Sequence, residues 1–587
     1  MGSTWIQGYS LGRTWRQASG VLHRAPAMAG DGGRREFLVL FAHHNMYFNM
    51  RFQELEAVAH LVANISRAEL YVEAPPCALS ASPLVRVRLS EAEARKICER
   101  AVLVKAVLEV WSLGRSCAEA VEAALGQGPE ARRQRRAFLA PPLKLQIRVE
   151  AFGRTLTLEE KGETMEMLRP LFEGDEVVDL KAPETNLWVL EEHRHECEEK
   201  THLGPRKSVA ERVFIGRQVA GGRSVDKKIK GGEKAYFQRY DLSQRAVLGP
   251  TTLENELAFL MANCACVQSG QMGMDPFCGT GGILVALAHF GARLYGGEID
   301  IRVVRGWRIA YTKNKAAVLD AAKKRGLDLT EPAEPAAAPA ETGSTSTRTD
   351  SWSLQYLLDI GLPAEVKKVK QVNPNARAEK DHRLTSAGGC NIFTNFVQYG
   401  LPSPEVVVCD NAMPPWRPVP GGWLDFIVTD PPYGVRAGAK KQGREGKAVV
   451  VQDISSYIPS KVSYGEDELS EDLLGFAAAS LKDRGRIVFL VPVDLADFLG
   501  IDRAAAEQGV EDGSRPNLHD ICHPKSGRKK DPRLCISETT RDPLLLDEAR
   551  YVDFIPRHAD LELLGASLQV LSGGLGRLLV TMRRLPR

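Results

Sequence analysis

The chain has 587 residues, of which 44% are hydrophobic and 26% are charged, and its formal net charge is +3. This length favours two or three domains, and the composition is that of an ordinary globular protein. No stretch approaches the roughly 18 apolar residues that a membrane-spanning helix needs, and the small net charge argues against nucleic-acid binding through the whole surface.

The first thirty residues contain no acidic residue but three arginines, Arg13, Arg16 and Arg24. This composition resembles an organelle transit peptide, although we prefer the alternative that translation starts at Met28. We therefore separate residues 1–34 as a leader. We expect a cytoplasmic protein, or an organellar one if the leader is a true transit peptide.

Eleven cysteines are scattered without a CxxC pair. Their odd number and irregular spacing favour a reducing compartment. Cys264 and Cys266 are too close for a typical zinc half-site, and Cys522, His523 and Cys535 do not form a convincing one. We predict no metal site.

The first half predicts a small α+β region. Residues 37–42 predict a buried strand, and 52–62 predict an amphipathic helix with period 3.6. Residues 85–89 and 143–152 alternate as strands. Residues 91–111 begin as a helix and continue into a β-branched strand.

From Leu248 the chain reads as strand, loop and helix in repetition, which predicts a doubly wound, mostly parallel Rossmann-like sheet. The expected strands are 272–274, 294–297, 406–408, 426–429 and 486–492, and the expected helices are 283–290, 302–315 and 469–481. Residues 331–350 are too poor in large apolar side chains to order themselves. With the charge-rich 505–548, they indicate surface insertions.

Positive charge is concentrated between Pro205 and Tyr240, with ten Lys or Arg against three acidic residues. A second cluster covers 132–136. Either cluster could be a solvated face or an RNA-binding surface. If RNA is the partner, we expect its phosphates to be bound by Arg206, Lys207, Arg217, Arg223, Lys227, Lys228 and Lys230.

Two motifs carry the chemistry. Asp275–Gly282 (DPFCGTGG) follows an expected strand and precedes a helix, and its glycines let a ligand approach the backbone. It lacks the spacing of dinucleotide-binding and phosphate-binding loops. Asp430–Gly434 (DPPYG) also follows an apolar strand. Taken alone it could be a tight turn, since Asp, Pro and Gly favour turns.

In this order the two motifs resemble the amino-methyltransferases that act on bases in nucleic acid. The resemblance implies S-adenosylmethionine as cofactor, bound by Asp275, Phe277, Gly279, Thr280, Gly281, Glu298, Asp300 and Asp410. Glu298 or Asp300 would hold the ribose hydroxyls, and Asp410 would accept from the adenine amine. Catalysis would rest on Asp430, Pro431, Pro432 and Tyr433, which would grip the target base.

The chemistry explains these residue types. An exocyclic amine is a poor nucleophile because its lone pair is delocalised into the ring, so an acceptor must draw on an N–H. The Asp430 carboxylate and the Pro431 carbonyl could both accept, and Tyr433 could stack on the base. The sulfonium already carries a good leaving group, so catalysis is mostly positioning. A base within a helix must be flipped to reach the pocket.

The resemblance extends to the tRNA (guanine-10-N2)-methyltransferase catalytic subunit, through LGPTTLENELAFLMAN at 248–263, AHFGARLYGGEID at 288–300 and TDPPYGVR at 429–436. It implies a ferredoxin-like and THUMP RNA-binding region at 35–210, a basic connecting segment at 211–247, and a Rossmann-like catalytic domain at 248–587 with insertions at about 316–385 and 505–548. It also implies tRNA as substrate and a small zinc-binding activator subunit as partner.

Two alternatives remain open. The same base-gripping motif serves rRNA guanine and DNA adenine N6 methylation, although the N-terminal half resembles an RNA-binding module. The chain could also be an inactive RNA-binding scaffold, although an intact Asp430–Tyr433 argues against that.

Overall fold

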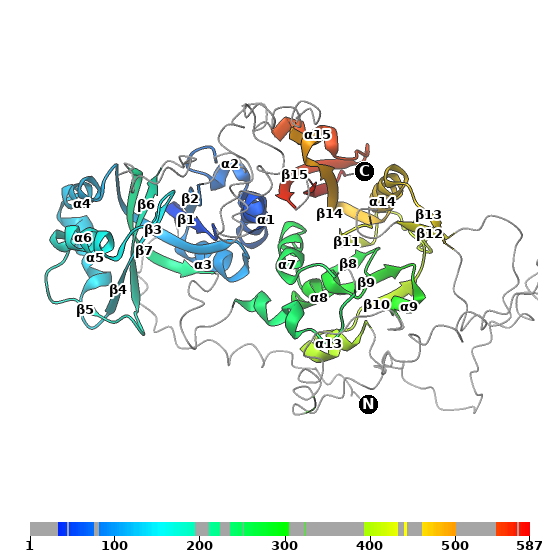
Figure 1. Ribbon diagram of the computed structural model, residues 1–587, viewed down its shortest axis with the longest axis horizontal. Helices are drawn as coiled ribbons and strands as arrows, with labels where there is room; N and C mark the ends of the chain where they lie inside the picture. The colour runs from blue at the N-terminus through cyan, green and yellow to red at the C-terminus, as the bar shows by residue number, and fades with distance from the viewer. Residues whose placement is uncertain are drawn as a thin grey trace, which may run out of the picture.

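The computed structural model describes residues 33–43, 46–75, 82–193, 210–222, 235–249, 252–304, 323, 392–432, 439–442, 461–499, 548–571 and 575–586. Two seven-stranded sheets lie side by side along the long axis of the molecule, one built from the N-terminal half and one from the C-terminal half (Figure 1). None of the helices in these ranges has the length and apolar character needed to cross a membrane.

The N-terminal sheet has the order β2-β1-β3-β7-β6-β4-β5. Its strands are β1 (Arg35–Phe41), β2 (Leu84–Leu89), β3 (Val104–Gly114), β4 (Lys144–Phe152), β5 (Val177–Val178), β6 (Thr185–His193) and β7 (Ala210–Gly221). The helical segments are η1 (Phe48–Met50), α1 (Arg51–Ala63), α2 (Arg67–Leu70), α3 (Glu91–Arg100), α4 (Cys117–Gly126), α5 (Gly128–Leu139), α6 (Leu158–Met167) and η2 (Arg169–Leu171). The α+β prediction is confirmed, with strand β3 following helix α3 as expected.

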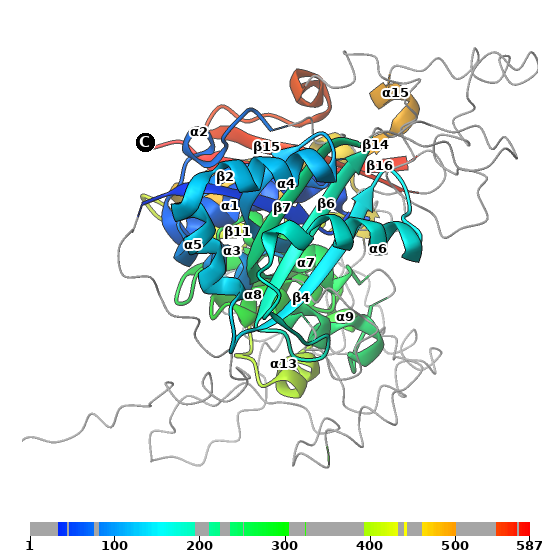
Figure 2. The ribbon, with the colours of Figure 1, turned by 90° about the vertical axis from the view of Figure 1, so that its left-hand side faces the viewer.

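Local sequence sets the helix starts. Ser90 and Thr157 each accept a hydrogen bond from the backbone N–H three residues on, and Glu93 and Glu160 return a bond to the cap residue. These capping boxes satisfy amide groups that the first turn of α3 and α6 leaves open. Apolar side chains of α4 and α5 then pack on β4, β6 and β7, and Figure 2 shows α4 and α6 across this face of the sheet.

Strand β7 corrects the predicted domain boundary. Residues 211–221 were expected in a connecting segment, but β7 lies in the middle of the N-terminal sheet, antiparallel to both β3 and β6. Because β3 also pairs with β1, the long strands β3 and β7 join two smaller β-units into one continuous sheet. The N-terminal domain therefore includes β7.

The C-terminal sheet has the order β10-β9-β8-β11-β14-β16-β15. Its strands are β8 (Met272–Asp275), β9 (Arg293–Glu298), β10 (Glu405–Val408), β11 (Leu424–Thr429), β14 (Leu481–Asp494), β15 (Leu561–Val570) and β16 (Leu575–Arg584). The five strands from β10 to β14 are parallel, and β16 runs antiparallel to both β14 and β15. This arrangement confirms the predicted mostly parallel Rossmann-like sheet.

The remaining elements cover and connect this sheet. They are η3 (Tyr236–Tyr240), η4 (Leu242–Gln244), α7 (Asn255–Cys264), α8 (Gly282–His289), α9 (Ile301–Val304), α13 (Thr394–Tyr399), α14 (Glu466–Ser480), α15 (Leu495–Leu499), η10 (Glu548–Phe554) and the small hairpin of β12 (Lys440–Gln442) and β13 (Lys461–Ser463). Of the helix expected at 302–315, only the first turn is described. The leader and both insertions fall almost wholly outside the described residues.

The two domains share a core at helices α1 and α7, which lie against each other between the sheets (Figure 1). Glu54 on α1 is fully buried and accepts bonds from the amides of Val102 and Leu103. Its Oε1 also accepts from Asn263 Nδ2 on α7 at 2.7 Å, and Asn263 Oδ1 accepts from Arg100 Nε at 2.7 Å. Buried groups with every oxygen bonded fix the orientation of the two domains.

Candidate active site

The first motif forms a tight loop between β8 and α8. Gly279 and Gly281 adopt φ values of +52° and +78°, a left-handed conformation that favours glycine. Gly281 is the residue directly before α8, so the loop turns straight into the helix. On the neighbouring strand, a Cβ at Gly297 would lie 2.9 Å from the carbonyl oxygen of Pro276. Glycine at 297 therefore lets the loop lie directly on β9.

Asp275 ends β8 and is buried, with 1% of its surface exposed. Its Oδ1 accepts from the Thr429 hydroxyl at 2.7 Å and from the Phe277 amide at 3.1 Å. Burial, partly offset by these two bonds, raises the pKa of Asp275 to about 7. The carboxyl group thus fastens the first motif to the strand that leads into the second.

Glu298 ends β9 beside the glycine loop. Its Oε2 accepts from the Gly279 amide at 3.0 Å and its Oε1 from the Asp300 amide at 2.7 Å. A carboxylate has about four acceptor positions, so two remain for a ligand. Burial raises the pKa of Glu298, and the nearby Lys461 opposes that rise.

Asp410 follows β10 and is buried, with its Oδ1 accepting from the Ala412 amide at 3.0 Å. The Cys409 amide donates to the Glu298 carbonyl at 3.0 Å, so the ends of β9 and β10 stay in register. Asp410 and Glu298 therefore stand at adjacent strand ends, as the sequence predicts.

The second motif follows β11, the central strand between β8 and β14. Asp430 lies close enough to Asp275 for its charge to raise the pKa of that group. Pro431 is buried and Pro432 half-buried, while Tyr433 falls outside the described residues. Strands β8 and β11 are paired in parallel, which brings both motifs to one edge, and the ring of Phe426 occupies the space that a side chain on Gly273 would need.

Four acidic side chains thus meet at the carboxyl ends of β10, β9, β8 and β11: Asp410, Glu298, Asp275 and Asp430. Open α/β sheets bind ligands in the crevice at this edge. The glycine loop supplies backbone N–H groups, and the acids supply acceptors for hydroxyl and amine donors. This chemistry suits a nucleoside-containing ligand.

Sequence reasoning missed three contributors. Thr429 precedes the second motif and bonds Asp275. Thr252 lies 3.2 Å from the Thr280 hydroxyl, so the segment after Leu248 packs against the glycine loop. Lys461 lies 3.2 Å from Asp300. The resemblance at 248–263 and 429–436 was a signal for the threonines, but no sequence signal marked Lys461.

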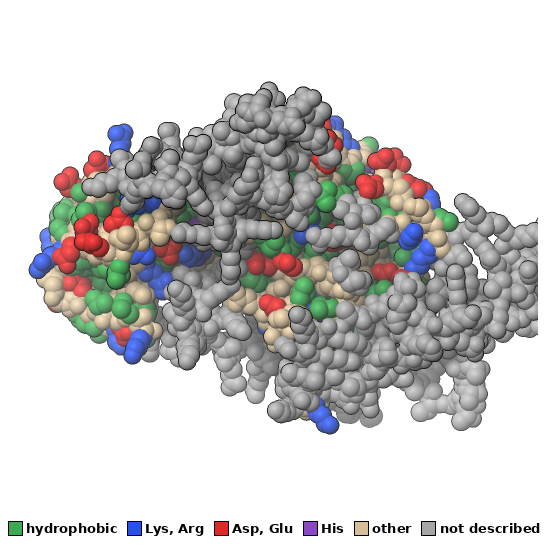
Figure 3. Space-filling view, in the orientation of Figure 1, with side chains coloured by type: hydrophobic (Ala, Val, Ile, Leu, Met, Phe, Trp, Pro, Cys, Tyr) green, Lys and Arg blue, Asp and Glu red, His purple; other side chains and the backbone are tan. Residues whose placement is uncertain are grey.

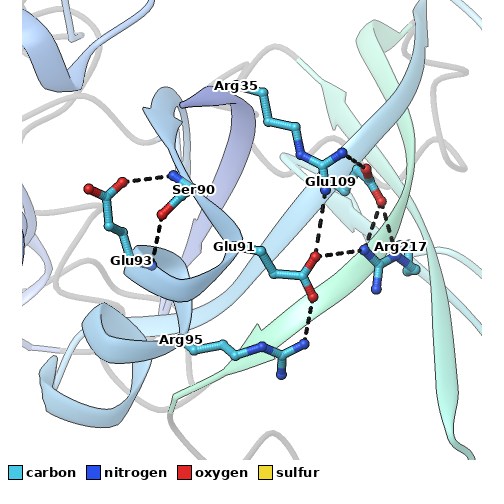
Figure 4. A network of polar contacts seen from close by, with 7 residues as sticks. All are labelled: Arg35, Ser90, Glu91, Glu93, Arg95, Glu109 and Arg217. Atoms are coloured by element: carbon cyan, nitrogen blue, oxygen red, sulfur yellow. Dashed lines mark hydrogen bonds and ion pairs between the residues drawn. The ribbon is translucent and has the colours of Figure 1, made fainter. Parts of the chain in front are cut away.

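The predicted RNA-binding residue Arg217 is placed elsewhere. It is 5% exposed and bonds Glu109 at 2.9 Å and Glu91 at 3.4 Å, within a network that also includes Arg35 and Arg95 (Figure 4). Its guanidinium also lies over the Phe138 ring. The prediction that Arg217 contacts phosphate is therefore wrong: it holds β7 to α3 and β3.

In the second basic cluster, residues 132–136, two arginines are likewise bonded to other groups of the protein. Arg135 is buried and bonds Gln127 and the Ala124 carbonyl, and Arg136 bonds Glu176. Figure 3 shows basic and acidic side chains interspersed over the left-hand end of the molecule, where Figure 1 places α4 and α5. The other predicted RNA contacts, Arg206, Lys207, Arg223, Lys227, Lys228 and Lys230, lie outside the described residues.

Comparison with protein families divides the chain as the structure does. Residues 35–224 match the Tmrp11 THUMP N-terminal domain, and residues 243–448 match the RMKL-like methyltransferase domain. The first match ends just after β7, in agreement with the revised boundary. The chain is a methyltransferase with an N-terminal THUMP-type domain and a Rossmann-like catalytic domain.

Similarity to individual proteins points to one kind of methyltransferase. The chain is 28% identical to tRNA (guanine(10)-N(2))-methyltransferase TRMT11 of Bos taurus, across 80% of this chain and 82% of the relative, and 28% identical to that of Homo sapiens, across 79% and 80%. The Dictyostelium discoideum protein of that name is 26% identical across 78% and 74%. The chain is a homologue of these enzymes, which confirms the resemblance predicted from its motifs.

Among solved structures, TrmN from Thermus thermophilus covers 94% of this chain and is itself covered completely, at 13% identity and a TM-score of 0.33. This level of similarity by itself defines neither fold nor function.

Proposed function

We propose that this protein transfers a methyl group from S-adenosylmethionine to the exocyclic N2 amine of guanine 10 in tRNA. One observation carries the proposal: Asp430 and Pro431 stand beside the glycine loop and its acids, at one edge of the sheet. The homology to tRNA (guanine(10)-N(2))-methyltransferases supports the substrate, and the THUMP N-terminal match supports an RNA partner over DNA.

The residues present fit the cofactor. Glu298 keeps acceptor capacity for the two ribose hydroxyls, and Asp410 ends the next strand, where it can accept from an adenine amine. The role of Asp275 differs, because its Oδ1 accepts hydrogen bonds from Thr429 and Phe277 and so joins the two motifs within the protein. When bound, S-adenosylmethionine supplies an electrophilic methyl group on a positively charged sulfur.

The protein's part of the reaction is to position the target amine, to accept hydrogen bonds from it and, through the Asp430 carboxylate, to take up the one proton that the amine loses on methylation. Asp430 and the Pro431 carbonyl can each accept an N–H of the guanine amine, which returns electron density to the nitrogen lone pair. The fixed φ of both prolines keeps this acceptor pair rigid. Most of the rate enhancement then comes from alignment of nitrogen, methyl and sulfur.

The proposal is tested with purified full-length protein and two tRNA transcripts that differ only at position 10. One carries guanosine, and the other carries inosine, which lacks the N2 amine. We expect N2-methylguanosine by nucleoside mass spectrometry from the first and no product from the second. Equal methylation of both transcripts, or a methyl group on another nucleoside, would contradict the proposal.

We also propose that a small zinc-binding activator subunit docks on the edge strand β10. In the described sheet β10 is paired only with β9. Val408, Met413 and Val419 expose apolar side chains on and after this strand, with 68% of Met413 accessible. An exposed edge with apolar neighbours is a site at which another chain can pair.

Co-expression with an affinity-tagged activator subunit tests this surface. Val408→Asp and Met413→Asp should reduce co-purification strongly. Val178→Asp is the matched control, because Val178 is equally apolar and 62% exposed but lies on β5 in the other domain. Full co-purification of both β10-side variants would refute the proposed docking site.

A further inference from the structure

The hairpin of β12 and β13 belongs to neither large sheet. It follows the second motif in the chain and precedes α14. At its base, the Tyr464 amide donates to the Ala439 carbonyl at 3.1 Å. Ala439, Tyr464 and Leu469 form a small buried cluster against Phe277 and Ala412. The hairpin therefore rests on the loops that follow β8 and β10, on either side of Glu298.

Lys461 on β13 connects this hairpin to the third loop, which follows β9. Its Nζ lies 3.2 Å from Asp300 Oδ2, and each side chain is only 15% exposed. The Asp300 amide donates to Glu298 Oε1. The ion pair thus acts on the short turn Glu298–Asp300, whose geometry sets the direction of the Glu298 carboxylate.

Charge balance gives the pair a second effect. The titratable or charged side chains that interact with Glu298 are Asp275, Cys278, Asp300, Cys409 and Lys461. Lys461 is the one cation in this group of described side chains. Its ammonium favours the ionised form of Glu298, and only that form keeps both of the remaining acceptor positions available to ribose hydroxyls.

We infer that Lys461 is a positioning residue for the cofactor: through Asp300 it fixes the Glu298 turn and links the hairpin that follows the base-gripping motif to the ribose-binding acid. The inference rests on the proposed function, because S-adenosylmethionine is its ligand. It also implies that the hairpin and the cofactor stabilise each other's position.

Isothermal titration of S-adenosylhomocysteine into the full-length protein tests this. We expect Lys461→Met to weaken binding about tenfold, as for loss of one close opposite charge, and Lys461→Arg to restore most of it. Lys441→Met is the matched control and should change binding less than about twofold. Lys441 lies on the paired strand β12, and its ammonium bonds Glu468 instead of a cofactor-site acid.

A pH series separates positioning from general damage to the fold. Loss of the cation disfavours ionisation of Glu298, so the lower pH limit of binding should move upward by about one unit in Lys461→Met. It should stay unchanged in Lys441→Met. Melting temperatures of all variants check folding, and the arginine variant keeps the test valid if the methionine variant is unstable.

The outcomes are distinct. Wild-type protein that fails to bind S-adenosylhomocysteine overturns the proposed function together with this inference. If the wild-type protein binds S-adenosylhomocysteine and Lys461→Met binds it with the same affinity and the same pH profile, this inference is overturned and the proposed function is not. Losses that add fully when Lys461→Met is combined with Asp300→Asn also overturn it, because residues that act as one pair must be coupled.

Discussion

The Thr429 hydroxyl donates a 2.7 Å hydrogen bond to the buried carboxyl group of Asp275 and so ties together the two motifs of the catalytic domain. The residues are 154 positions apart in the chain and stand on the adjacent parallel strands β8 and β11. The next residue after Thr429 is Asp430. The bond therefore joins the strand end that carries the glycine loop to the strand end that carries Asp430, the acid that we propose binds the target base.

Asp430→Ala should slow methyl transfer roughly a hundredfold and leave cofactor binding nearly intact, because we assign Asp430 to the base and not to the cofactor. Losing an acceptor used mainly in the transition state costs about 3 kcal/mol, roughly a hundredfold in rate. Single-turnover kinetics and titration with S-adenosylhomocysteine measure the two effects. A wild-type rate in the variant would remove Asp430 from the mechanism.

Gly297→Ala should weaken cofactor binding, because the added Cβ would lie 2.9 Å from the Pro276 carbonyl oxygen and push the glycine loop off β9. Gly475→Ala on α14 is the control: it meets no atom within 4 Å and should stabilise the helix by roughly 1 kcal/mol. Cofactor titration and thermal unfolding measure both variants. Unchanged cofactor affinity in Gly297→Ala would show that the loop tolerates the displacement.

Asp275 should make the free energy of unfolding depend on pH. Its pKa is raised to about 7 in the folded protein from an ordinary value of 3.8. The folded state then binds more protons than the unfolded state between these values, so this group lowers stability as pH rises through that window, by about 1.4 kcal/mol per unit of pKa shift at most.

Asp275→Asn removes this titration and keeps an oxygen for both bonds, since Thr429 and Phe277 donate to the same Oδ1. The free energy of unfolding of the variant minus that of the wild type should therefore increase as the pH rises from about 4 to about 7. Above about pH 7 this difference should be constant. Urea unfolding without cofactor measures this difference. A difference that is the same at pH 5 and pH 7.5 would refute the raised pKa.

Arg217→Met should destabilise the N-terminal domain and leave the tRNA affinity of the folded protein unchanged. Removing the Arg217 guanidinium leaves the negative charge of the partly buried Glu109 less well balanced by positive charge. Breaking a buried ion pair costs about 3 kcal/mol or more. Thermal unfolding and tRNA binding at several salt concentrations separate the two roles. A shallower salt dependence for Arg217→Met, with no change in stability, would reinstate it as a phosphate contact.

Much of the catalytic domain was predictable because its signals are local. The apolar run at 426–429 lies within β11, the run at 486–492 lies within β14, and both motifs directly follow strands as expected. The expected strands 294–297, 406–408 and 426–429 end within two residues of Glu298, Asp410 and Asp430. Parallel strands in such a sheet bring their carboxyl ends together whatever the intervening sequence.

Tertiary structure alone decided which distant surfaces meet. The sequence of β7 reads as part of a basic segment, and only its pairing with β3 and β6 shows that Arg217 is enclosed by Glu91 and Glu109. Lys461 and Asp300 lie far apart in the chain, and neither belongs to a local pattern that predicts the other. Periodicity and turn residues report on neighbours within one element, whereas long-range partners depend on complementary packing and charge that exist only once the sheets have formed.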